Sequence, residues 1–138
     1  MKKLLKLLLG SICFYFLVAQ PLKASLFASL AMRSGIDLRG QSVLLNAAQF
    51  IEPCNVNIAK ALGNTFIQMN DKTMAAIAYG KAITCSTANA QLRFTYGQIL
   101  IDMGYVQGND SIADALKLEP NNPVYKSEWN RITRYQLQ

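Results

Sequence analysis

Apolar residues in the middle of the chain recur at intervals of three and four, the spacing of one face of an α-helix. The first such face is formed by Ile58, Ala61, Leu62, Thr65, Phe66 and Met69. A second segment places smaller residues around one aromatic side chain, at Ala75, Ala78, Tyr79 and Ala82. Gly63 lies inside the first pattern, although glycine costs a helix about 1 kcal/mol relative to alanine. The pattern therefore predicts two short helices, with the glycine letting the second helix approach the first closely.

The same pattern returns after 34 residues. Leu62-Gly63 falls on Tyr96-Gly97, and Phe66 falls on Leu100. Positions that recur at intervals of 33 to 34 are Ala48, Ala82 and Ala115, and also Asn55, Asn89 and Asn122. The latter two asparagines can cap the helices that follow them, and Pro123 suits a first helical turn. A fixed period of this size is typical of stacked helical repeats.

These residues resemble the tetratricopeptide-repeat (TPR) family. In the middle copy the resemblance is carried by Leu62, Gly63, Phe66, Ala75, Tyr79 and Ala82; in the next copy it is carried by Tyr96, Gly97, Leu100, Gly104, Ala115, Leu116 and Pro120. The family's frequent tryptophan is replaced by Ala59 and Arg93, and the last full copy lacks one residue near positions 105–108. The resemblance implies an all-α solenoid of tandem helix-turn-helix repeats. A plain helical bundle whose spacing coincides by chance is the alternative.

The expected organisation is a leader over residues 1–21 followed by a repeat domain over residues 22–138. The domain divides into a degenerate repeat (22–55), two fuller repeats (56–89 and 90–122) and a capping helix (123–138). In the degenerate repeat we expect a helix over residues 25–34 closed by Gly35, and a second helix capped by Ser42 and ending near Ile51. Its apolar side chains, among them Leu26 and Phe50, are expected to cover the middle repeat. In the last helix the core-facing residues are expected to be Tyr125, Trp129 and Ile132.

The first residues have the pattern of an export signal. Lys2, Lys3 and Lys6 precede a charge-free stretch from Leu7 to Ala19, as in a secretory signal peptide. Cleavage after Ala19 or Ala24 leaves a large residue three places before the cut, so a retained membrane anchor over residues 4–19 is the rival interpretation. That stretch is shorter than the roughly 20 apolar residues of a comfortable span. Lipidation of Cys13 fits less well because Ile12 is bulky. Each alternative predicts an exported domain in the periplasm or another compartment outside the cytoplasm.

Composition excludes several classes of function. The 138 residues include no histidine, which removes histidine-based catalytic triads and the commonest metal ligand. The eight carboxylates are scattered, and no phosphate-binding glycine loop is present. The formal net charge is +6, but no stripe of Lys or Arg indicates nucleic-acid binding. We therefore expect no enzyme activity, no cofactor, no metal site and no nucleic-acid partner.

Cys54 and Cys85 are the most informative polar pair. One precedes the first helix of the middle repeat, and the other ends its second helix. Because these helices are expected to run antiparallel, the two cysteines should meet. In an oxidising compartment they are a disulfide candidate; two half-buried thiols are the alternative.

A binding groove is implied by the family resemblance, in which the first helices of the repeats line a concave face. The residues expected there are Asn57, Lys60, Asn64, Gln68, Gln91, Phe94, Gln98, Ile101 and Asp102. Lys60 and Asn64 resemble the start of a carboxylate clamp for acidic peptide ends, but Thr95, Val124 and Glu128 depart from it. A solvated polar groove that binds nothing is the alternative. Asn109 matches a glycosylation sequon but is better explained as a helix cap.

The sequence thus predicts a non-catalytic adaptor or scaffold of the cell envelope that binds a protein or peptide partner. Two alternatives remain. One is a structural subunit that self-assembles end to end as a homo-oligomer, and the other is an accessory subunit of a membrane complex.

Overall fold

The computed structural model describes residues 20–33 and 35–136, and these residues form α-helices without a strand. In chain order the helices are α2 (Gln20–Ala31), α3 (Leu38–Ile51), α4 (Val56–Gln68), α5 (Lys72–Cys85), α6 (Ala90–Asp102), α7 (Gln107–Leu118) and α8 (Pro123–Gln136). The expectation of an all-α repeat solenoid is therefore confirmed for the described residues.

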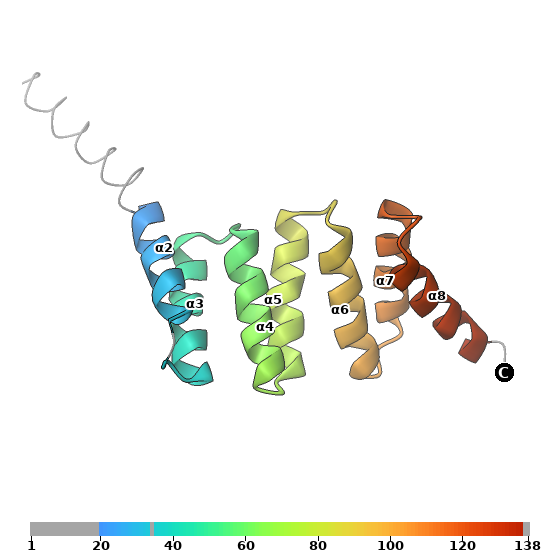
Figure 1. Cartoon of the computed structure of the whole chain (residues 1–138), viewed down its shortest axis with the longest axis horizontal. Helices are drawn as coiled ribbons and strands as arrows, with labels where there is room; N and C mark the ends of the chain where they lie inside the picture. The colour runs from blue at the N-terminus through green and yellow to red at the C-terminus, as the bar shows by residue number, and fades with distance from the viewer. Residues whose placement is uncertain (1–19, 34, 137–138) are drawn as a thin grey trace, which may run out of the picture.

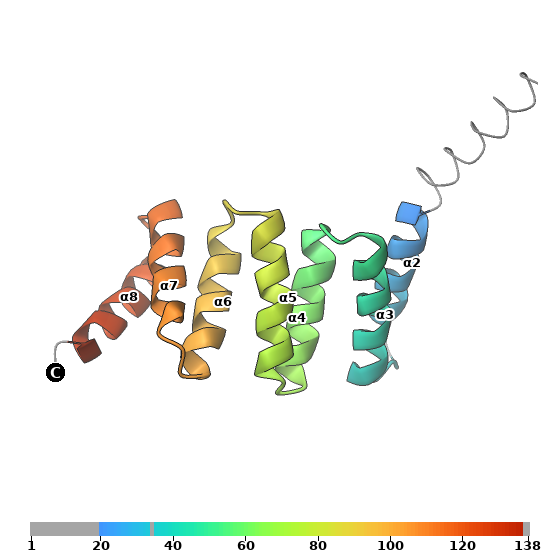
Figure 2. The same ribbon diagram turned by 180° about the vertical axis from the view of Figure 1, so that it is seen from behind.

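The helices stack side by side in antiparallel pairs, each packed on the helix before it and the helix after it (Figure 1). One layer contains α2, α4, α6 and α8. The other layer contains α3, α5 and α7, which are nearest the viewer when the molecule is seen from behind (Figure 2). Pairs α2–α3, α4–α5 and α6–α7 correspond to successive repeats, and α8 closes the stack.

Close packing within the α4–α5 and α6–α7 pairs depends on glycine. A Cβ atom at Gly63 would lie 2.6 Å from the Tyr79 ring, so this glycine admits the aromatic ring of α5 against α4. In the next pair the two backbones themselves meet, because a Cβ at Gly97 would lie 2.8 Å from the Gly108 carbonyl oxygen. The expectation that these glycines have a packing role is confirmed.

Helix starts follow side-chain capping in most cases. Asn55 accepts hydrogen bonds from the backbone of α4, and Asn89 does the same for α6. The second helix of the first repeat departs from prediction, because α3 begins at Leu38 with Asp37 as its cap. Ser42, the expected cap, is buried inside α3 and donates its hydroxyl to the Arg39 carbonyl.

The start of α7 also differs from prediction. The helix begins at Gln107, two residues before Asn109, and its N-cap position makes no side-chain hydrogen bond. Asn109 therefore lies within the first turn and does not cap the helix.

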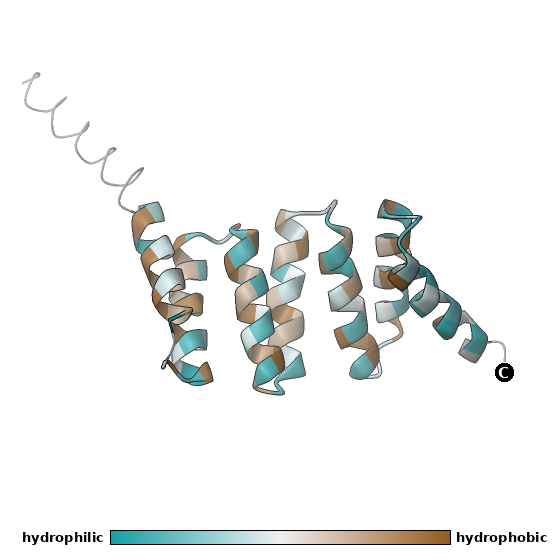
Figure 3. Cartoon of the chain, viewed as in Figure 1, coloured by the Kyte–Doolittle hydropathy of each residue, from teal (hydrophilic) through white to brown (hydrophobic). Residues whose placement is uncertain are grey.

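The two ends of the stack differ in polarity (Figure 3). Tyr125 and Ile132 of α8 are buried in a core cluster with Phe94, Ile112 and other residues, and Trp129 packs against it. At the other end Leu22, Leu26 and Met32 of α2 and the turn after it are 62%, 57% and 61% exposed. The predicted covering role of the first repeat is therefore only partly correct.

Phe50 is the clearest exception in that repeat. The inward face of α3 is formed by Ser42, Leu45, Ala48 and Gln49. Successive helical residues are rotated by about 100°, so Phe50 falls on the outside and is 87% exposed.

The leader assigned to residues 1–21 lies mostly outside the described residues; Gln20 and Pro21 belong to the first turn of α2. Among the helices that the structure describes, none is both long and apolar enough to cross a membrane. The anchor expected over residues 4–19 is outside this range.

Candidate peptide groove

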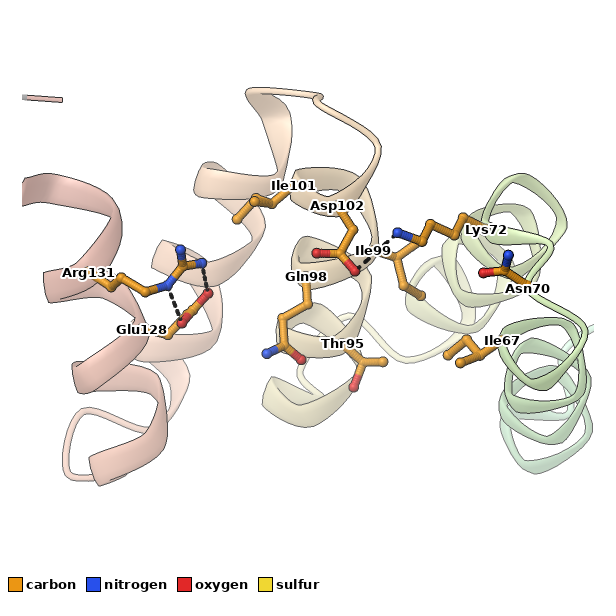
Figure 4. A pocket seen from close by; sticks show the side chains of 10 residues that line it. All are labelled: Ile67, Asn70, Lys72, Thr95, Gln98, Ile99, Ile101, Asp102, Glu128 and Arg131. Carbon is orange, nitrogen blue, oxygen red and sulfur yellow. Dashed lines mark hydrogen bonds and ion pairs between the residues drawn. The ribbon is translucent and has the colours of Figure 1, made fainter. Parts of the chain in front are cut away.

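A hollow that we call the central groove lies between α4, α6 and α8 and has a volume of about 490 Å³. Its lining residues are Ile67, Asn70, Lys72, Thr95, Gln98, Ile99, Ile101, Asp102, Glu128 and Arg131 (Figure 4). Apolar and uncharged polar side chains thus form the middle of the groove, and charged side chains flank it.

The charges that flank the central groove neutralise one another. Lys72 Nζ lies 3.5 Å from Asp102 Oδ2 on one side. On the other side the Arg131 guanidinium donates to both carboxylate oxygens of Glu128, at 2.5 and 2.9 Å. The hydrogen bond from Arg131 holds the pKa of Glu128 below its ordinary value, against the effect of partial burial. Each cation is paired with one carboxylate, so the four charges beside the groove sum to zero.

A second hollow, the N-terminal pocket, lies between α2, α3 and α4 and has a volume of about 290 Å³. Its lining residues are Ser25, Ala28, Met32, Leu45, Glu52, Asn55, Asn57, Ile58 and Ala61. This pocket was not predicted from the sequence. The sequence feature that could have indicated the pocket is the small size of Ala28 and Ala61. They line it from α2 and α4, the first helices of two successive repeats.

One face of α4 connects the two hollows. Asn57 lines the N-terminal pocket and Ile67 lines the central groove, and Lys60 and Asn64 lie between them at helical spacing. Lys60 Nζ is 3.5 Å from Gln91 Oε1 on α6. The Tyr79 hydroxyl donates to Asn64 Oδ1 at 2.6 Å, so the Asn64 amide nitrogen is the atom left to meet a ligand.

Most of the predicted groove residues reach solvent. Exposed side chains are those of Asn57, Asn64, Gln68, Gln91, Gln98 and Asp102; Lys60 and Ile101 are half-buried. Phe94 departs from the expectation. Its side chain is 8% exposed, and its ring centroid lies 4.6 Å from that of Tyr125. Phe94 therefore joins α6 to α8 beneath the groove and does not present itself to a ligand.

No protein-family model and no functionally curated protein matches this sequence. Solved structures do match its fold. The first TPR of Spaghetti (RPAP3), bound to the HSP90 peptide SRMEEVD, gives a TM-score of 0.71 at 13% identity, covering 84% of this chain and 94% of that one. The Yersinia enterocolitica type III secretion chaperone SycD, in complex with a peptide of the translocator YopD, gives 0.64 at 18% identity, covering 80% and 86%.

The chain has the tetratricopeptide-repeat fold. The same fold forms part of a much larger enzyme, the Thermobaculum terrenum O-GlcNAc transferase. There the TM-score is 0.60 at 24% identity, and 80% of this chain covers 21% of that protein. These likenesses show the fold, while function has to be argued from the groove.

The TPR carboxylate clamp can be compared position by position. Thr95 and Glu128 both line the central groove, whereas Lys60, Asn64 and Val124 are not among its lining residues. The chemistry differs, because an acid occupies one position at which the clamp has a cation. Val124, at the other cationic position, is an apolar side chain that is 56% exposed. An acidic peptide end would meet Glu128 unfavourably in this groove.

A disulfide joins the start and the end of the TPR repeat formed by α4 and α5. Cys54 and Cys85 lie with their sulfur atoms 2.14 Å apart and their Cα atoms 5.3 Å apart, as a disulfide joining the α3–α4 turn to the end of α5. Gln49, which is 5% exposed, donates to the Pro53 carbonyl at 2.8 Å and so supports the same turn. Among residues 20–33 and 35–136, no cluster of three or more His, Cys, Asp and Glu side chains could hold a metal ion.

Proposed function

We propose that this protein is a non-catalytic adaptor of the cell envelope that holds an extended segment of another protein along α4 and α6. The observation that carries the proposal is one face of α4, on which Asn57 lines the N-terminal pocket, Ile67 lines the central groove, and Lys60 and Asn64 lie between them at helical spacing. An arrangement of this kind suits an extended peptide, because side-chain pockets alternate with polar groups that can meet its backbone.

The chemistry of these residues favours a neutral segment with apolar side chains. The two cations beside the central groove are each paired with a carboxylate, so the pairs add little attraction for a charged ligand. Asn64 and Gln98 supply amide groups for backbone hydrogen bonds, and Lys60 supplies one cation. Met32, Ile58 and Ala61 make the N-terminal pocket suitable for an apolar side chain.

Two structures with the same fold support a binding role. One was solved with an HSP90 peptide and the other with a peptide of the translocator YopD. Their low identity to this chain means that neither partner can be transferred to it. What the two structures support is that this fold can hold a peptide segment.

We place the protein outside the cytoplasm because of its leader and its cysteines. Cleavage after Ala19 would leave α2 whole. Cleavage after Ala24 would remove the first part of α2, including Ala24, which is fully buried. Intact mass of the native protein tests this: loss of residues 1–19, or a full-length chain in the membrane, supports export, whereas a full-length chain in the cytosol contradicts it.

The binding role is tested by placing a photo-crosslinking residue at Gln98 in the central groove, with Lys81 on the opposite layer as the matched control. Peptides recovered from the Gln98 position are then synthesised and titrated against the purified protein. Lys60→Ala and Asn64→Ala should each weaken binding by about 0.5–1.5 kcal/mol, the contribution of an ordinary hydrogen bond. Lys81→Ala should have no effect. Equal crosslinking from both positions, or unchanged affinity in both groove variants, would contradict the proposal.

A further inference from the structure

The N-terminal pocket lies between two repeats, and the turn that joins them forms one of its walls. Glu52 and Asn55, at the two ends of this turn, line the pocket, and so do Asn57 and Ile58 at the start of α4. Asn55 connects these residues. Its side-chain oxygen accepts hydrogen bonds from the backbone nitrogens of Asn57 and Ile58, and its amide nitrogen donates to Glu52 Oε2 at 2.6 Å. The shape of the pocket therefore depends on where this turn is held.

The Cys54–Cys85 bridge holds the turn against α5. Cys54 lies inside the turn between α3 and α4, and Cys85 ends α5. The bridge thus fixes the link between two repeats to the second helix of the later one. Pro53 and Cys54 are exposed, so burial contributes little to holding this position. Without the bridge, the placement of the first repeat relative to the second loses its covalent constraint.

A second turn of the protein shows what the bridge adds. Glu52-Pro53-Cys54-Asn55 is matched by Glu119-Pro120-Asn121-Asn122 between α7 and α8. The same contacts are present there, because Asn122 donates to Glu119 at 2.9 Å and accepts from the Val124 backbone nitrogen at 3.1 Å. That turn has an asparagine in place of the cysteine, so the turn conformation forms without a bridge. What the bridge adds is a fixed position of the α3–α4 turn relative to α5.

A further hollow, the cysteine hollow, lies on the same turn. It has a volume of about 520 Å³ and is lined by Glu52, Pro53, Cys54, Asn55 and Val56. Glu52 and Asn55 line the N-terminal pocket as well, whereas Cys54 does not. The turn is therefore a wall shared by two hollows, and a molecule can reach Cys54 without entering the N-terminal pocket.

We propose that the redox state of the Cys54–Cys85 bridge controls the N-terminal pocket: the bridged protein binds an apolar side chain there, and the reduced protein binds it severalfold more weakly. The inference rests on the proposed function, which gives this pocket its apolar ligand. Its physical basis is preorganisation. A pocket whose walls are fixed before the ligand arrives loses less conformational entropy on binding than a pocket that the ligand has to order.

Reduction is a thiol–disulfide exchange with a dithiol of another molecule. Cys54 is exposed and lines the cysteine hollow, whereas Cys85 is half-buried, so Cys54 is the sulfur open to attack. One thiolate of the dithiol bonds to Cys54, and Cys85 leaves as a thiolate that takes up a proton. The second sulfur of the dithiol then bonds to the first and releases Cys54. Two electrons pass from the dithiol to the bridge, and a disulfide oxidant reverses the reaction.

Binding of N-acetyl-leucinamide, a leucine side chain between two amide groups, tests the proposal on the purified protein. Its dissociation constant is read by ¹⁵N NMR from the backbone amides of Asn57 and Ile58, before and after reduction with dithiothreitol. Reduction should weaken binding severalfold. The double variant Cys54→Ser with Cys85→Ser should bind as the reduced wild type does, and dithiothreitol should leave its affinity unchanged.

The matched turn between α7 and α8 separates a local effect from a general loss of structure. Reduction should speed hydrogen exchange at the Asn57 and Ile58 amides and leave exchange at the Val124 amide unchanged. Equal acceleration at Val124 would give the bridge a general structural role and overturn the inference. Equal affinity in both redox states would also overturn it, while leaving the proposed function intact. If the probe shifts neither Asn57 nor Ile58 in either state, the pocket is not a ligand site and both proposals fail there.

Discussion

The Tyr79 hydroxyl donates a hydrogen bond of 2.6 Å to Asn64 Oδ1, joining a buried residue of α5 to an exposed residue of α4. Tyr79 is 2% exposed, and burial raises its pKa above the ordinary value, so its hydroxyl stays protonated at neutral pH. Because the hydroxyl occupies the amide oxygen, the amide nitrogen is the atom of the exposed Asn64 side chain that is left to meet a ligand. A core residue therefore sets the orientation of a candidate ligand-binding group.

Tyr79→Phe is predicted to free the Asn64 amide while keeping the core filled. The unfolding free energy should fall by about 0.5–1.5 kcal/mol, since one hydrogen bond is lost and its acceptor can still reach water. Relaxation of the Asn64 side-chain amide, measured by ¹⁵N NMR, should show increased mobility. If the amide of Asn64 is as ordered in Tyr79→Phe as in the wild type, Tyr79 does not position it.

Gly63→Ala is predicted to destabilise the protein. Its Cβ would lie 2.6 Å from two carbons of the Tyr79 ring, which is enclosed by the core and tied to Asn64. Overpacking of this kind costs about 1–3 kcal/mol, more than the roughly 1 kcal/mol that alanine contributes to a helix. The midpoint of urea unfolding should therefore fall.

Gly80→Ala is the matched control for this prediction. Gly80 is also a helical glycine, but a Cβ there would lie 3.8 Å from its nearest neighbour, Tyr96. The free energy of unfolding of Gly80→Ala should rise by up to about 1 kcal/mol, because alanine favours a helix more than glycine does. Equal effects of the two substitutions on the unfolding midpoint would show that the contact of Gly63 with Tyr79 is unimportant.

The period of the sequence was enough to predict the fold because each repeat contains its own packing signal. Gly63 paired with Tyr79, and Gly97 in the next repeat, indicated where two helices approach closely. Asn89 and Asn122 indicated where helices begin, and each accepts a hydrogen bond from the backbone of the helix that follows. Such signals are local, and the structure confirms them.

Predictions failed where the outcome depended on neighbours that the sequence pattern does not specify. Phe94 has the spacing of a groove residue, but Tyr125 from α8 covers it. Phe50 was expected to be buried, but no helix among the described residues packs over that side of α3. The N-terminal pocket was missed because it is formed jointly by α2, α3 and α4. A single-helix pattern does not show such a cavity.

Loss of the Cys54–Cys85 bridge is predicted to lower the free energy of unfolding, because the unfolded chain then gains conformational freedom. The bridged residues are 31 positions apart, and closing a loop of this size stabilises by roughly 3.7 kcal/mol in the chain-entropy model. The double variant Cys54→Ser with Cys85→Ser should lose this amount in urea unfolding. Reductant should lower the stability of the wild-type protein by the same amount and leave the double variant unchanged. A wild-type protein that is insensitive to reductant would contradict the bridge.

The Glu128–Arg131 pair beside the central groove is predicted to make a small, pH-dependent contribution to the free energy of unfolding. The pKa of Glu128 is lowered in the folded protein, first by the hydrogen bond from Arg131. A carboxyl group whose pKa is lower in the folded protein stabilises the fold at any pH above its unfolded pKa, which is about 4.3. That contribution is lost as the pH falls through the pKa of the folded protein. For a pair three residues apart on a helix the contribution is about 0.2–0.5 kcal/mol.

Urea unfolding of the wild-type protein and Glu128→Gln should therefore differ by this amount at pH 7. The difference should shrink as the pH falls below about 4, because the wild-type carboxylate is then neutralised and resembles the amide. A difference between wild type and Glu128→Gln that stays constant from pH 7 into acid would show that the loss comes from packing, and would remove the ion pair from the energetics of the groove.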